Sequence, residues 1–248
     1  MKNNFFFKDQ LSNIYKKSSK FSEVTSQILY GEKFKILSRN KDWIKIKTSF
    51  DNYIGYIKNR KYTNIHKPSH KVSSLKAIIF KKPNIKTKYF LPFASKISII
   101  QESKRFIEYD KNRWIKKKDI KKINHLEKDY SKILRLFLKT KYLWGGKTYK
   151  GIDCSAILQL FFYYNDRFYP RDTKDQIKHS KKASIKKVLK KGNVIFWKGH
   201  VAICINSKEL IHAYGPEKKV LIMPIIKTIN IIKKTASLSV IKISSIRY

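Results

Sequence analysis

Apolar and polar residues alternate in short runs along the first half of the chain. Glycine, asparagine and aspartate separate these runs, which is the pattern of small antiparallel β-domains. A first group of predicted strands, within residues 10–64, comprises 27–30, 34–37, 43–47 and 53–57. A second group, within residues 72–122, comprises 77–80, 96–100, 106–109 and 114–115. Because Trp43 and Trp114 occupy comparable places in the two groups, we interpret them as a weak repeat of two small β-barrels.

The hydrophobic period changes near residue 125. Residues 130–138 carry apolar side chains at helical spacing and predict a helix. A second helix is expected to hold Cys154, and a short third helix is expected after residues 170–173. The remaining predicted elements are strands at 193–197, 200–205, 209–213, 219–223 and 238–246. Helices that precede an antiparallel sheet predict an α+β fold.

Composition narrows the possible partners. The chain has 57 lysines and arginines against 17 acidic residues, a formal net charge of +40. Only eight of the basic residues are arginine, the usual reader of bases, and lysine is spread through every segment. We therefore interpret the charge as a compositional bias and expect no specific nucleic-acid partner.

The two cysteines, Cys154 and Cys204, form neither a disulfide framework nor a metal-ligand spacing. We therefore expect no metal and no cofactor. The first nine residues have too short an apolar stretch for a signal peptide, and no window has the length of a membrane span. These features predict a cytoplasmic protein, with a periplasmic or extracellular location as the alternative.

The candidate chemistry centres on Cys154. It follows the glycine-bearing loop 148–153 and begins a predicted apolar helix, where free N–H groups and the helix dipole lower a thiol pKa. His200 and His212 each lie on an apolar alternating stretch, and their separation suits two strands of one hairpin. A thiol, a base and a group that orients the base are the parts of a cysteine nucleophile site, as in papain-like enzymes.

Residues 125–248 resemble the NlpC-type papain-like cysteine peptidases of bacterial cell-wall metabolism. The motifs that carry this resemblance are 142–146, 151–155, 170–173, 191–196, 199–203 and 210–213. The front of the chain is similar to paired bacterial SH3-type domains, on residues 27–32 and 51–56. The resemblance divides the chain into an SH3-type domain at 1–66, a second at 67–123 and a peptidase domain at 124–248.

The resemblance implies hydrolysis of the amide bond between γ-D-glutamate and diaminopimelate or L-lysine. The substrates would be peptidoglycan stem peptides with a free N-terminal L-Ala, processed in cell-wall recycling. Cys154 would be the nucleophile, His200 the general base and His212 its orienter. The substrate would be bound by Tyr142, Trp144, Asp153, Ser155, Asp172 and Thr173. Glu23 and Tyr53 of the first SH3-type domain would complete a pocket for the substrate amine.

Two other functions stay open on the sequence. One is a secreted wall hydrolase that its SH3-type domains anchor to the wall. The other is a non-catalytic basic module that binds wall polymer or nucleic acid. The sequence also leaves open whether the third residue of the stem peptide is diaminopimelate or lysine. It does not determine the oligomeric state or whether the first SH3-type domain closes the active site.

Overall fold

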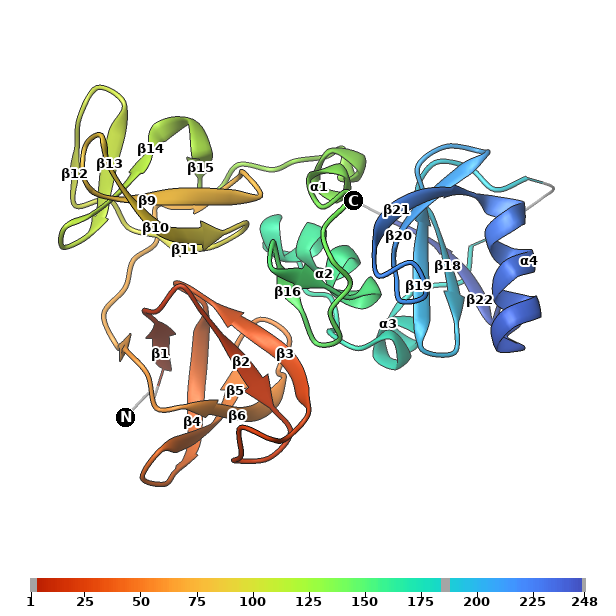
Figure 1. The fold of residues 1–248 in the computed structure, drawn as a ribbon, viewed down its shortest axis with the longest axis horizontal. Coiled ribbons are helices and arrows are strands. Elements are labelled where there is room, and N and C mark those ends of the chain that lie inside the picture. Colours follow the sequence, from red (N-terminus) through yellow and green to blue (C-terminus); the bar gives the residue numbers. More distant parts are fainter. Residues whose placement is uncertain (1–3, 184–187, 247–248) are drawn as a thin grey trace. The chain divides into compact units, whose positions relative to one another are not determined.

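The computed structural model describes residues 4–183 and 188–246 (Figure 1). The chain divides into two compact units, Met1–Leu126 and Glu127–Tyr248. The first unit is built from β-strands, whereas the second combines helices with an antiparallel sheet. The predicted α+β fold is therefore confirmed.

The first part of unit one is a seven-stranded antiparallel sheet with the order β3-β2-β6-β5-β4-β1-β7. Its strands are β1 (Asn4–Phe7), β2 (Leu11–Tyr15), β3 (Val24–Leu29), β4 (Lys33–Arg39), β5 (Trp43–Thr48), β6 (Ile54–Lys58) and β7 (Tyr62–Thr63). Alternation places every second residue inside: Ile44 and Ile46 of β5 are buried together with Phe34 of β4. β1 and β2 were not among the predicted strands.

The second part of unit one consists of a five-stranded and a three-stranded sheet, ordered β10-β9-β14-β13-β12 and β11-β8-β15. Its elements are β8 (His70–Val72), β9 (Lys76–Lys82), β10 (Ile85–Pro92), β11 (Lys96–Ile97), β12 (Gln101–Glu102), β13 (Phe106–Asp110), β14 (Arg113–Lys116), the 3₁₀ turn η1 (Lys117–Asp119) and β15 (Ile120–Lys122). Sequence reasoning missed β10, because its first residues are mostly exposed lysine, threonine and tyrosine rather than alternating apolar residues.

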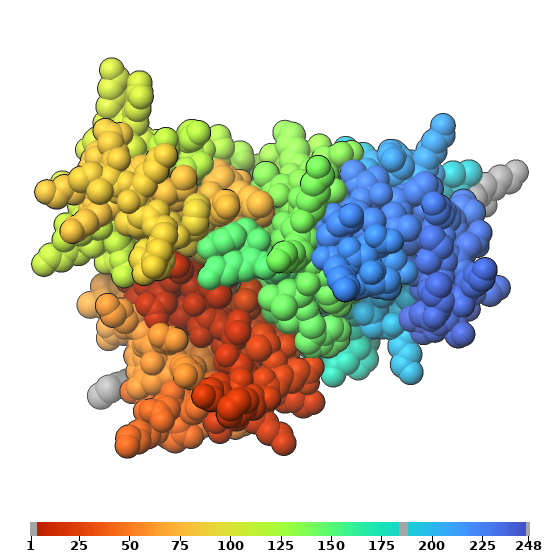
Figure 2. All heavy atoms as spheres, viewed as in Figure 1, coloured from red at the N-terminus to blue at the C-terminus, as the bar shows by residue number. Residues whose placement is uncertain are grey.

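Tyr30 joins the two parts of this unit. Its side chain is fully buried in the second core, with its ring centroid 5.3 Å from that of Tyr109. Its hydroxyl donates a hydrogen bond to Asp110 at 3.3 Å and accepts one from Lys8. Its backbone carbonyl accepts a hydrogen bond from the N–H of Lys96 at 3.0 Å. The space-filling view shows the two parts in direct contact (Figure 2).

Unit two contains one five-stranded antiparallel sheet, ordered β21-β20-β19-β18-β22, and four α-helices among the described residues. The sheet strands are β18 (Asn193–Trp197), β19 (His200–Cys204), β20 (Glu209–Tyr214), β21 (Lys219–Pro224) and β22 (Lys242–Ser245). The helices and the small hairpin are α1 (Tyr130–Leu136), β16 (Lys147–Thr148), β17 (Gly151–Ile152), α2 (Cys154–Tyr164), α3 (Thr173–His179) and α4 (Ile225–Ala236). Every residue of α2 is buried, so this helix forms the centre of the unit.

Helix α4 is an element that the sequence analysis did not anticipate. It follows β21 directly, where only strands were expected. Ile225, Thr228 and Ile232 are its buried residues, and their spacing of three to four positions is helical. The isoleucine-rich composition of the segment obscured this period, because isoleucine favours strands.

None of the helices in the described part of the chain is long and apolar enough to cross a membrane.

Candidate active site

Cys154 is the first residue of α2, as predicted. Asp153 is the N-cap, with an extended backbone, and its Oδ1 accepts a hydrogen bond from the N–H of Ala156 at 2.8 Å. Its Oδ2 accepts from the N–H of Gly145 at 3.0 Å. Gly145 has a φ of +71°, a conformation that glycine adopts without steric cost. The glycine-bearing loop and the cap together fix where the helix begins.

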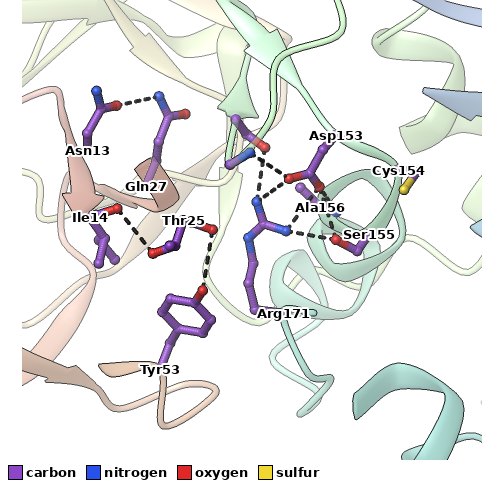
Figure 3. Close-up of polar contacts among 12 residues, drawn as sticks. Asn13, Ile14, Thr25, Gln27, Tyr53, Asp153, Cys154, Ser155, Ala156 and Arg171 are labelled. Carbon is purple, nitrogen blue, oxygen red and sulfur yellow. Dashed lines mark hydrogen bonds and ion pairs between the residues drawn. The ribbon is translucent and has the colours of Figure 1, made fainter. Parts of the chain in front are cut away.

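A buried ion pair holds this cap in place (Figure 3). Nη2 of Arg171 lies 2.6 Å from Oδ2 of Asp153, and Nη1 donates to Oδ1 at 3.0 Å. Nη1 also donates to Oγ of Ser155 at 2.8 Å, and Ser155 donates to Oδ1 of Asp153 at 3.1 Å. The oxygens of Asp153 and Ser155 therefore already have partners within the protein. Substrate binding by these two residues stays a prediction.

The sulfur of Cys154 lies in polar surroundings. It is 3.8 Å from the carbonyl oxygen of Gly199, and it accepts hydrogen bonds from the N–H of Val201 and the hydroxyl of Thr173. Gly199 and Val201 flank His200 on both sides. The nucleophile predicted at the start of α2 is thus adjacent to the start of β19, which carries the predicted base.

Burial raises the pKa of the Cys154 thiol to about 12, and the neighbouring carboxylate of Asp153 adds to the rise. The sequence-based expectation of a lowered pKa is wrong for this structure. The helix terminus and the two hydrogen bonds do favour the thiolate, but the loss of solvation outweighs them. The resting site therefore holds a neutral thiol.

The two predicted histidines lie on neighbouring antiparallel strands, as expected from their spacing. Nε2 of His200 is 2.9 Å from Nδ1 of His212, and Nε2 of His212 is 3.3 Å from Sδ of Met223. His212 is fully buried, whereas His200 is half-buried. Burial lowers the pKa of His200 to about 4. Burial, followed by the charge of His200, lowers the pKa of His212 to about 3.

Two aromatic rings that the sequence analysis did not single out surround this pair. Tyr214 stacks on His212, with ring centroids 4.7 Å apart and an interplanar angle of 12°. Its ring is also 5.7 Å from that of His200, and the Trp197 ring lies 5.6 Å from His200. Tyr214 could have been found from its position two residues after His212, because such residues share one side of a strand.

The remaining predicted residues of unit two differ in their surroundings. Burial raises the pKa of Tyr142, and the nearby acidic groups Cys154 and Asp153 add to the rise. Trp144 is 57% exposed. Asp172 occupies the N-cap position of α3 without bonding the backbone there, and burial raises its carboxyl pKa.

Glu23 and Tyr53 belong to unit one. Glu23 pairs with Lys16 at 3.4 Å on the surface, and the hydroxyl of Tyr53 donates to the carbonyl of Thr25 at 3.4 Å (Figure 3). Their contribution to an amine pocket stays a prediction.

The side chains of residues 4–183 and 188–246 include no cluster of three or more histidine, cysteine or acidic groups that could hold a metal ion.

Comparison with known families identifies the two parts that carry these features. Residues 139–235 match the NlpC/P60 family, and residues 14–61 match the bacterial dipeptidyl-peptidase SH3 domain. The first match contains Cys154, His200, His212 and Met223.

Relatives extend the similarity over most of the chain. Dipeptidyl-peptidase 6 of Lysinibacillus sphaericus is 23% identical over 82% of this chain and 84% of its own length. The γ-D-glutamyl-L-lysine dipeptidyl-peptidase of Bacillus subtilis is 23% identical over 83% of this chain and 77% of its own length.

A solved NlpC/P60 family protein from Bacillus cereus has the same fold. Its TM-score is 0.76 at 18% identity, over 89% of this chain and 94% of that one. The chain therefore carries a bacterial SH3-type domain followed by a cysteine peptidase domain of the NlpC/P60 family.

Proposed function

We propose that this protein hydrolyses the γ-D-glutamyl amide bond to diaminopimelate or L-lysine in peptidoglycan-derived stem peptides with a free N-terminal L-Ala. The observation that carries the proposal is the position of the Cys154 sulfur, at the N-terminus of α2 and against the backbone on both sides of His200. The names of the similar dipeptidyl-peptidases support the substrate class.

The reaction begins with a neutral Cys154 thiol and a neutral His200 imidazole. Proton transfer from the Cys154 thiol to His200 creates the thiolate, which attacks the γ-carbonyl carbon. The free N–H groups in the first turn of α2 stabilise the oxyanion, with a contribution of roughly 3–4 kcal/mol per donor in comparable sites. His200 then protonates the leaving amine and activates the water that releases the acyl group.

Asp172 is the preferred partner for the substrate ammonium in this scheme. Its carboxylate is partly buried and makes no capping hydrogen bond at α3, whereas the carboxylate of Asp153 is committed to Arg171. Because burial raises the pKa of Asp172, an arriving ammonium would restore the stabilisation that the carboxylate lacks. A blocked amine could not supply this additional positive charge.

We further propose that the enzyme acts on released peptides during recycling in the cytoplasm, rather than on the intact wall. The test compares L-Ala-γ-D-Glu-L-Lys, its diaminopimelate counterpart, the N-acetylated form of each peptide and intact sacculi. We expect release of L-Ala-γ-D-Glu from one or both free peptides. Failure to cleave either free peptide would contradict the proposed activity, and efficient cleavage of sacculi would favour a secreted wall hydrolase instead.

The Asp172→Asn variant tests the amine site. We expect its kcat/KM for the free peptide to fall by about 10-fold or more, the value of one charged hydrogen bond. The difference between free and acetylated peptides should narrow at the same time. Asp175→Asn, in the first turn of the same helix, is the matched control. An unchanged preference for the free amine in Asp172→Asn would reject this role.

A further inference from the structure

Met223 lies directly behind the histidine pair. In the pairing of β20 with β21, His212 is opposite Leu221 and Met223 is opposite Leu210. Met223 is therefore the diagonal neighbour of His212, within reach of a long side chain. Its Sδ is 3.3 Å from Nε2 of His212.

The burial of His212 makes this contact chemically informative. The side chain is fully buried, so both of its ring nitrogens need partners within the protein. The lowered pKa of His212 indicates a neutral ring, with one N–H and one lone pair. A thioether sulfur accepts a weak hydrogen bond but has no proton to donate. The nitrogen that faces Met223 is therefore the one that carries the proton.

We propose that the Met223 thioether holds His212 in its Nε2–H tautomer and thereby sets the direction of the hydrogen bond between the two imidazoles. Nδ1 of His212 then carries the lone pair and accepts from Nε2–H of His200 across 2.9 Å. This leaves the lone pair of His200 on Nδ1. Met223 is thus a positioning residue, and its effect on catalysis rests on the proposed function.

The tautomer decides whether His200 can act as the base. In the proposed arrangement the S–H bond of Cys154 breaks, its electron pair stays on sulfur and the proton binds Nδ1 of His200. The resulting imidazolium keeps its Nε2–H bond to His212. In the opposite tautomer His200 would carry its proton on Nδ1 and could not accept another there, while two lone pairs would face each other between His212 and Met223.

Nitrogen NMR of ¹⁵N-histidine-labelled full-length protein tests the tautomer without any substrate. The His200→Gln and His212→Gln variants assign the two rings by loss of their signals. We expect Nε2 of wild-type His212 to be protonated and its Nδ1 to have the shift of a lone-pair nitrogen. Met223→Leu, which has similar volume and no acceptor, should mix the two tautomers of His212. A wild-type His212 protonated on Nδ1 would overturn the proposal.

Activity on the free tripeptide supplies the second readout. Met223→Leu should lower kcat/KM by about 5- to 10-fold, since His212 loses the acceptor of its buried N–H. Met223→Gln, whose amide oxygen can accept the same N–H, should restore both the tautomer and most of the activity. Leu221→Val, in the same apolar cluster, is the packing control and should leave the tautomer unchanged.

These outcomes separate the two claims. A wild-type protein that cleaves no γ-glutamyl peptide contradicts the proposed function, and the NMR result then decides the tautomer alone. A Met223→Leu variant with the wild-type tautomer contradicts the role of Met223 even if the peptide is cleaved. A Met223→Gln variant as impaired as Met223→Leu in both readouts also contradicts it.

Discussion

At the scale of single residues, Asp153 is the side chain that organises the start of α2. One carboxylate oxygen accepts a hydrogen bond from the N–H of Ala156, and the other accepts one from the N–H of Gly145. The guanidinium of Arg171 contacts both oxygens. Both charged groups are almost completely removed from solvent, at 1% and 6% exposure. A bidentate pair of this kind fixes geometry as well as charge. The position of Cys154 therefore depends on Arg171, although the two side chains have different functions.

Replacing Arg171 alone should lower the free energy of unfolding more than replacing Arg171 and Asp153 together. We expect Arg171→Met to lower the free energy of unfolding by about 3–5 kcal/mol, because it leaves a buried carboxylate uncompensated. The double variant Asp153→Asn/Arg171→Met should recover part of this loss. Urea unfolding measures both, with exposed Arg135→Met as the control. A loss for Arg171→Met no greater than that of the control would contradict the account.

The buried imidazole of His212 should make the protein sensitive to acid. Its pKa is about 3 in the folded protein and 6.5 in the unfolded reference, so the unfolded chain binds more protons between these values. The free energy of unfolding should therefore fall as the pH decreases through this window. Urea midpoints measured between pH 7 and pH 4 test the slope. The urea midpoint should change less with pH in His212→Gln than in His179→Gln, which replaces an exposed histidine. Equal slopes in the two variants would contradict the prediction.

At the scale of elements, Tyr30 connects two small β-structures that have separate sheets. The residue follows β3 of the first sheet, yet its ring is part of the second core. The aromatic contact with Tyr109 and the hydrogen bond from its hydroxyl to Asp110 are both made across this junction. The two parts of the first unit therefore share one buried side chain.

Two substitutions of Tyr30 test this junction. Tyr30→Phe should lower the free energy of unfolding by about 1 kcal/mol, because only the hydroxyl contacts are lost. Tyr30→Ala should lower it by about 3–5 kcal/mol, because it leaves a cavity between the two cores. Both are measured by urea unfolding of the full chain. Tyr89→Ala, at a half-exposed tyrosine of β10, is the control, and a Tyr30→Ala loss as small as the control would contradict the shared core.

Sequence patterns predicted some elements better than others, for physical reasons. The start of α2 was predicted because a local motif, with Asp153 as the cap, determines a helix N-terminus. α4 was missed because its isoleucines have high strand propensity, and packing against the sheet decides its conformation. The ion pair of Arg171 with Asp153 joins residues 18 positions apart, which no local pattern specifies. The contact of Met223 with His212 depends on strand register, which no local pattern specifies.

At the scale of the whole molecule, the proposed catalytic groups all come from one unit. Cys154, His200, His212 and Met223 lie within Glu127–Tyr248 and within the segment that matches the NlpC/P60 family. The first unit supplies Glu23 and Tyr53 only as predicted contributors to substrate binding. The central claim is therefore that Cys154 is the nucleophile of a γ-D-glutamyl peptidase.

The two cysteines provide the most direct test of that claim, because both are buried and burial raises the pKa of both thiols to about 12. The measurement is the rate at which L-Ala-γ-D-Glu is released from the free tripeptide by the wild-type, Cys154→Ala and Cys204→Ala proteins. We predict that Cys154→Ala abolishes release, whereas Cys204→Ala retains it. Full activity of Cys154→Ala, or loss of activity only in a folded Cys204→Ala, would contradict the account.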